Sequence, residues 1–105
     1  MSKPRQIWWS YAKNMIRMYP QLQEQYIQGK RMDPGTLREY HAVRKAMEQT
    51  AELPNGAVRL KVVELVLIKG THNIAGAAIK THCSEKTAKN YHSDFIRLVG
   101  KFRGL

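Results

Sequence analysis

Three histidines and the single cysteine of this 105-residue chain lie in its last third, at His72, His82, Cys83 and His92. Imidazole and thiolate groups bind zinc, but structural zinc sites use pairs of ligands that are a few residues apart. His82 and Cys83 are adjacent and no second cysteine follows, so the spacing disfavours a metal site. Cys83 and His92 could form a nucleophile and its base, but we expect Cys83 to be buried, where a thiol is inert. We therefore predict neither a metal nor a cofactor.

Other catalytic patterns are also missing from the sequence. The acidic residues Glu64, Glu85 and Asp94 are scattered and form no carboxylate cluster of the kind that holds two catalytic metals. No Gly-rich stretch has the spacing of a phosphate-binding P-loop. The sequence therefore predicts a binding protein and not an enzyme.

The charge of the chain points to a polyanionic partner. Lys and Arg number 18 against 8 Asp and Glu, which gives a formal net charge of +10. Such an excess is typical of proteins that bind nucleic acids, and it also occurs in ribosomal and membrane-surface proteins. Charge alone thus indicates a class of partner and does not identify the partner.

Basic and amide side chains recur at helical spacing near the C-terminus. Lys86, Lys89, Asn90, Ser93 and Arg97 fall on one face of a predicted helix from Glu85 to about Phe102, with Gly100 as a possible earlier end. The opposite face carries an apolar stripe of Ala88, Tyr91, Phe95, Leu98, Val99 and Phe102. Lys can contact phosphates or guanine, and Asn can pair with an adenine edge. The alternative to nucleic-acid binding is that these side chains form an ordinary solvent-exposed helix face.

A short helix precedes this one and gives the pair the outline of a helix-turn-helix. Thr71 or Asn73 can cap a helix from Ile74 to Thr81, and Ser84 can cap the final helix. Small residues from Ala75 to Ala78 would let the two backbones approach, while Ile74 and Ile79 should point to the core. We predict that Lys86, Thr87, Lys89, Asn90 and Ser93 face a DNA groove. Thr71, Asn73, Lys80 and Arg97 should lie nearer the phosphates.

The sequence also predicts helices in the remaining segments. Apolar residues recur from Ile7 to Tyr19, and Pro20 should end or kink that helix before a more polar piece from Gln21 to Gln28. The Trp and Tyr residues on it could stack on bases, but such a stripe is more often core or dimer interface. Gly and Pro residues between Gly29 and Thr36 mark a boundary. We therefore predict an N-terminal helical arm over residues 1–32 and a helix-turn-helix domain over residues 33–105.

Two further segments complete the predicted domain. Asp33 with Pro34, or Thr36, can begin a helix whose apolar stripe is Leu37, Tyr40, Val43, Met47 and Ala51, and Pro54-Asn55-Gly56 ends it. Residues 57–69 are apolar on nearly all sides, which suits a central buried helix or a strand. We choose the helix because no second strand-like segment is available for pairing. The predicted fold class is all-α.

These patterns resemble phage and prophage transcriptional regulators of the RinA type, whose helix-turn-helix is similar to region 4 of sigma factors. The resemblance covers about four fifths of the chain and is carried by Tyr11 to Pro20, Tyr40 to Ala46, Arg59-Leu60 with Val63 to Val66 and Lys69, Gly76 to Ala78, Ser84 to Ala88 and Tyr91 to Val99. It implies an N-terminal helix followed by a three- to four-helix domain. It also implies binding to phage promoter DNA and activation of late genes.

The leading hypothesis is a sequence-specific double-stranded DNA-binding protein that regulates phage or prophage transcription. Two alternatives remain: a small terminase-like subunit that binds DNA during packaging, and an interaction module that binds RNA polymerase. A homodimer is consistent with a single helix-turn-helix per chain. The chain has no apolar run of membrane-spanning length and no signal-peptide pattern, so we expect a cytoplasmic location and no membrane partner.

Overall fold

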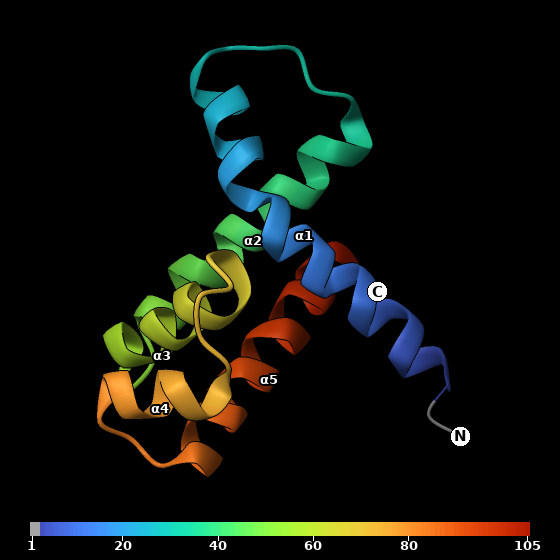
Figure 1. Cartoon of the computed structure of the whole chain (residues 1–105). Coiled ribbons are helices and arrows are strands. Elements are labelled where there is room, and N and C mark those ends of the chain that lie inside the picture. The colour runs from blue at the N-terminus through green and yellow to red at the C-terminus, as the bar shows by residue number, and fades with distance from the viewer. Residues whose placement is uncertain (1–2) are drawn as a thin grey trace.

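The computed structural model describes residues 3–105, with side chains from Ile7 onward, and this part is helical without any β-strand. The predicted all-α class is confirmed. Met1 and Ser2 of the predicted arm lie outside the described residues. The elements in chain order are α1 (Lys3–Ile27), α2 (Pro34–Ala51), α3 (Gly56–Val63), the π-helical segment η1 (Glu64–Ile68), α4 (Ile74–Thr81) and α5 (Glu85–Arg103). In Figure 1, α1 and α2 form a hairpin at one end, and α3, α4 and the start of α5 gather at the other.

The first helix is longer than the sequence suggested, because α1 continues through Pro20 to Ile27. Proline cannot donate the hydrogen bond that a residue at this position normally gives to the carbonyl one turn earlier. Packing offsets that loss: Ile16 and Tyr19 before the proline and Leu22 after it are all buried. Of the two predicted effects of Pro20, an end or a kink of the helix, the end is wrong, since tertiary contacts on both sides hold the chain in one helix.

The hairpin between α1 and α2 is held by a helix cap and by stacked rings. The Asp33 carboxylate accepts hydrogen bonds from the Thr36 backbone N–H at 3.2 Å and from its hydroxyl at 2.6 Å, with Pro34 in the first turn, as predicted. The ring of Tyr40 lies between those of Tyr19 and Tyr26, at centroid distances of 5.5 and 4.7 Å. The aromatic residues of α1 thus serve the α1–α2 contact in this region.

The segment after Gly56 is a helix, as predicted, but its last turns are π-helical. The Lys69 N–H donates to the Glu64 carbonyl at 2.8 Å, five residues earlier, which is the π-helical pattern. Val63 and Leu67 are buried in one apolar cluster, whereas Val62 and Leu65 are buried in another. The nearly all-round apolarity of this segment is explained by its position between two cores.

The larger core joins the two halves of the chain. Met15 and Ile16 of α1 pack with Val43 of α2 and with Phe95 and Val99 of α5. The arm predicted for residues 1–32 therefore packs directly on the segment 33–105. In α2 and α5 the buried apolar stripes are shifted by one residue from the predicted stripes. The buried residues that the predicted stripes omitted are Ala42, Ala46 and Thr50 in α2 and Ile96 and Gly100 in α5, while Ala51 is exposed.

Gly100 of α5 allows the Trp8 ring of α1 to approach α5 closely. A Cβ atom on Gly100 would lie 2.5 Å from Cζ3 of Trp8, far inside the contact distance of two carbon atoms. The expectation that α5 could end at Gly100 is wrong: the helix runs to Arg103, and Gly104 with φ of +87° caps it. Gly100 is retained inside a helix because the Trp8 ring occupies the space of a side chain.

We predict that Gly100→Ala destabilises the protein by about 1–3 kcal/mol, because the new methyl group forces the Trp8 ring out of its position. Urea unfolding followed by circular dichroism measures the change. The matched control is Gly35→Ala in the first turn of α2, where the added Cβ would meet the Asp33 carboxylate at an ordinary 3.4 Å. A Gly100→Ala protein as stable as the Gly35→Ala protein would contradict the proposed close packing.

His92 is a half-buried group on the side of α5 that faces α1. Its Nδ1 is buried without a hydrogen-bond partner among the described residues. Burial, with a smaller effect from the charge of Lys13, lowers the pKa of His92 below its usual value of 6.5. The folded state therefore prefers neutral His92 more strongly than the unfolded state does. This preference stabilises the fold above about pH 6.5 and is lost as the pH falls through the lowered folded pKa.

The urea concentration at the unfolding midpoint should accordingly decrease when the pH is lowered from 7.5 to 5. His92→Gln should reduce this decrease because it removes the proton-binding group. The measurement is a set of urea titrations across this pH range for both proteins. His72→Gln, which removes an imidazole near the start of α4, serves as the matched control for the loss of a histidine. Equal pH profiles for the wild type and His92→Gln would refute the assignment.

Candidate nucleic-acid interface

The two helices α4 and α5 are each fixed at their start by a side-chain cap. The Asn73 amide oxygen accepts a hydrogen bond from the Gly76 N–H at 2.8 Å. The Ser84 hydroxyl accepts from the Thr87 N–H at 3.0 Å and donates to the Thr87 hydroxyl at 2.8 Å. Both predicted caps are confirmed, and both satisfy backbone donors that a helix start would otherwise leave free.

The turn between α4 and α5 is tight and hydrogen-bonded. His82 adopts the left-handed conformation, with φ of 60° and ψ of 40°, which a residue with a side chain rarely takes. The Cys83 N–H donates to the Ala78 carbonyl at 3.0 Å, and the His82 N–H donates to the Ile79 carbonyl at 3.2 Å. This arrangement is a Schellman-type end of α4, and it redirects the chain directly into α5.

Small residues let α4 pack closely on its neighbours. Ala77 and Ala78 of α4 are buried with Ala88 of α5 and with Val62 and Leu65, and Cys83 packs against the same cluster. The prediction that Ile79 points to the core is wrong, because this side chain is 78% exposed. Positions 74, 77 and 78 follow the spacing of one helix face, and position 79 falls outside it.

Lys86, Lys89 and Asn90 of α5 are exposed and project from the first half of the helix. None of their side chains makes a hydrogen bond or ion pair within the described part of the chain. Thr87 and Ser93 are half-buried, and the Thr87 hydroxyl is already engaged by the Ser84 cap. The structure therefore leaves two ammonium groups and one amide free to meet a ligand, whereas Thr87 has a local role.

The predicted residues before α5 have different environments. Lys80 is exposed at the end of α4, on the chain segment that leads into the turn. The Asn73 side chain is used by the cap of α4, and the Thr71 hydroxyl lies 2.9 Å from Nδ1 of His72. Of these three, Lys80 presents an unpaired charge among the described residues, and the other two have intramolecular partners.

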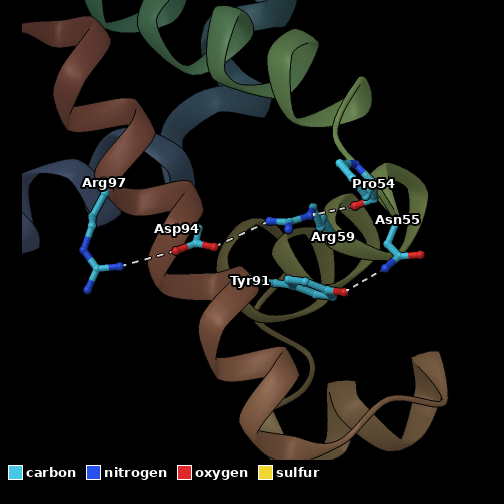
Figure 2. Close-up of polar contacts among 6 residues, drawn as sticks. All are labelled: Pro54, Asn55, Arg59, Tyr91, Asp94 and Arg97. Atoms are coloured by element: carbon cyan, nitrogen blue, oxygen red, sulfur yellow. Dashed lines mark hydrogen bonds and ion pairs between the residues drawn. The ribbon is translucent and has the colours of Figure 1, made fainter.

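Arg97 belongs to a network that sequence reasoning missed. Figure 2 shows the Asp94 carboxylate of α5 between two guanidinium groups, 3.4 Å from Arg97 and 3.5 Å from Arg59 of α3. Arg59 also donates to the Pro54 carbonyl at 2.9 Å and lies 4.5 Å from the centre of the Tyr91 ring. The network links α3 to the exposed side of α5 and orients Arg59.

The outer side of α5 continues beyond Arg97. The Arg97 guanidinium lies 5.6 Å from the centre of a Trp9 ring, so α1 also contributes to its position. Lys101 is exposed one helical turn further along. The spacing of Lys86, Asn90, Arg97 and Lys101 could have identified Lys101 from the sequence. Arg59 gave no such signal, because it reaches this surface from another helix.

No group of three or more His, Cys, Asp or Glu side chains within residues 7–105 is arranged to hold a metal ion. Cys83 is half-buried against the small core, and its sulfur lies 3.3 Å from the Thr81 hydroxyl. The described helices include none that is both long and apolar enough to cross a membrane.

Comparison with known proteins adds no assignment, since no family model, curated protein or solved structure matches this chain.

Proposed function

We propose that this protein binds double-stranded DNA sequence-specifically, with α4 and α5 acting as a helix-turn-helix and the first half of α5 as the recognition helix. The observation that carries the proposal is the set of Lys86, Lys89 and Asn90, which are exposed and unpaired within the described residues at the capped start of α5. A protein that uses these groups for its own stability would pair them.

The side chains of Lys86, Lys89 and Asn90 suit binding in the major groove of DNA. A helix fits this groove, and α5 has 19 residues, which corresponds to about 28 Å. Asn90 can pair with an adenine edge, which distinguishes bases, while the two Lys side chains can reach guanine acceptors or phosphates. Lys80 and Arg97 on either side would contact the backbone. The backbone N–H groups at the start of α5 that the Ser84 cap does not engage add a favourable electrostatic environment for a phosphate.

The regulatory role follows from the resemblance to RinA-type regulators. Under this proposal the protein acts on phage or prophage promoters in the cytoplasm, and the formal net charge of +10 supports association with a polyanion. The close packing of α1 on α5 would keep the N-terminal segment beside the DNA-binding helix. From that position, α1 could contact the transcription machinery.

The first test is selection of bound fragments from sheared double-stranded DNA at two salt concentrations, followed by titration of the selected site. If about five phosphates are neutralised, the logarithm of the affinity should fall with the logarithm of the salt concentration at a slope of about −4.5. Lys89→Ala together with Asn90→Ala should remove the preference for the selected site. A slope near zero, or selection without a common motif, would refute the proposal.

The matched control for the double variant is Gln28→Ala together with Lys30→Ala. These residues are exposed at the tip of the α1–α2 hairpin, at the opposite end of the molecule from α4. The control also removes one amide and one positive charge. It should lower the affinity for all sequences slightly and keep the site preference, so the comparison separates base recognition from net charge.

Asp94→Asn tests the role of the carboxylate that holds Arg59 and Arg97. Removing this charge frees the Arg97 guanidinium for a phosphate, so affinity for any duplex should rise several-fold at low salt and the salt slope should steepen by about one unit. Fluorescence anisotropy with a random duplex measures both quantities. Glu48→Gln frees Arg44 of α2 by the same change of charge and should have a smaller effect. Equal effects of the two substitutions would argue against an interface at Arg97.

A further inference from the structure

A second basic site lies between α2 and the end of α5, away from the proposed DNA-binding residues. A cavity of about 240 Å³ is lined by Arg38, His41, Ala42 and Lys45 of α2 and by Phe102 and Arg103 of α5. Three of these side chains are cationic, one is an imidazole, and no carboxylate lines the cavity. Cations held around one space repel one another unless an anion lies between them.

A nitrogen atom of Arg103 also lacks a hydrogen-bond acceptor. The Nε of Arg103 is buried and has no hydrogen-bond partner among the described residues. A buried N–H without an acceptor costs free energy, particularly on a charged group, so its persistence needs an explanation. The nearby carboxylate of Glu39 accepts a hydrogen bond from the Tyr11 hydroxyl. Arg103 also lines the cavity, so its guanidinium can donate hydrogen bonds to an anion there.

Neighbouring rings hold two of the lining groups in place. The Lys45 ammonium lies 5.1 Å from the centre of the Phe102 ring. The His41 ring contacts those of Tyr26 and Tyr40, with centroids 5.6 and 5.3 Å apart. Side chains that are already ordered lose less conformational entropy when they bind a ligand.

We propose that this cavity binds a phosphate group. The guanidinium groups of Arg38 and Arg103 match the geometry of phosphate oxygens, and Lys45 adds a point charge. The cavity is smaller than common sites for whole cofactors, so it fits the phosphate and leaves the rest of the ligand outside. The phosphate could belong to a small phosphorylated molecule or to a nucleic-acid backbone, and both supply the same group.

This site is separate from the proposed DNA-binding face. Arg103 follows Lys86 by about 25 Å along the helix axis. Phe102 and Arg103 also lie on sides of α5 that differ from the exposed row of Lys86, Asn90 and Arg97. Binding at the cavity therefore goes beyond the proposed function and can succeed or fail independently of it.

Titration of the full chain with inorganic phosphate, followed through backbone amide NMR shifts, tests the proposal. The amides of residues 38–45 and 102–103 should shift saturably, whereas those of residues 84–97 should change little. Arg38→Gln and Lys45→Gln alter exposed side chains, and each should weaken phosphate binding about tenfold or more. Arg103→Gln should abolish it, with circular dichroism confirming that the variant is folded.

Lys101→Gln is the matched control, because it removes the same charge from α5 outside this cavity. Saturable shifts that survive Lys101→Gln and are lost in Arg38→Gln support the site. Absence of saturation in the wild type, or equal weakening by both substitutions, overturns it. A nucleoside 5′-monophosphate and a short duplex, titrated in parallel, distinguish the sources: tighter binding of the nucleotide indicates a small molecule, and tighter binding of the duplex at residues 38–45 indicates nucleic acid.

Discussion

The burial of one side of α5 is the constraint on which the rest of this structure depends. Phe95, Ile96 and Val99 are buried among α1 and α2, and Ala88 is buried among α3, η1 and α4. One helix thus belongs to both apolar clusters of the molecule. Because hydrophobic burial is the dominant favourable contribution to folding, any shift of α5 would weaken both clusters together. The outward side of α5 is thereby fixed, and so is the position of its basic residues.

Polar contacts then set where the helices begin and how exposed side chains are oriented. The caps at Asn73 and Ser84 set where α4 and α5 begin, and the left-handed His82 sets the direction of the chain between them. Asp94 joins α5 to α3 through Arg59 at the exposed edge. Exposed ion pairs contribute little to stability, so we attribute to this network mainly an effect on side-chain position. The ammonium groups of Lys86 and Lys89, by contrast, have no partner among the described residues.

The two basic surfaces of α5 differ in how they are built. The proposed DNA-binding face uses exposed side chains from one helix, so its residues share a simple spacing. The proposed phosphate cavity combines Arg38 and Lys45 of α2 with Arg103 of α5. An exposed row suits an extended polyanion, whereas cations gathered around one cavity suit a single anionic group. A single helix can therefore present two kinds of anion site, one on its outer face and one toward α2.

Local patterns in the sequence determined the helices, their caps at Asp33, Asn73 and Ser84, and the exposed row on α5, because each depends on residues within a few positions of one another. Only the tertiary structure decided that α1 continues through Pro20, that Gly100 makes room for Trp8, and that Ile79 remains exposed. It also brought Arg59 to Asp94 and Arg38 to Arg103. These features depend on which helix faces lie against each other, and that choice follows from packing the whole chain around two apolar clusters.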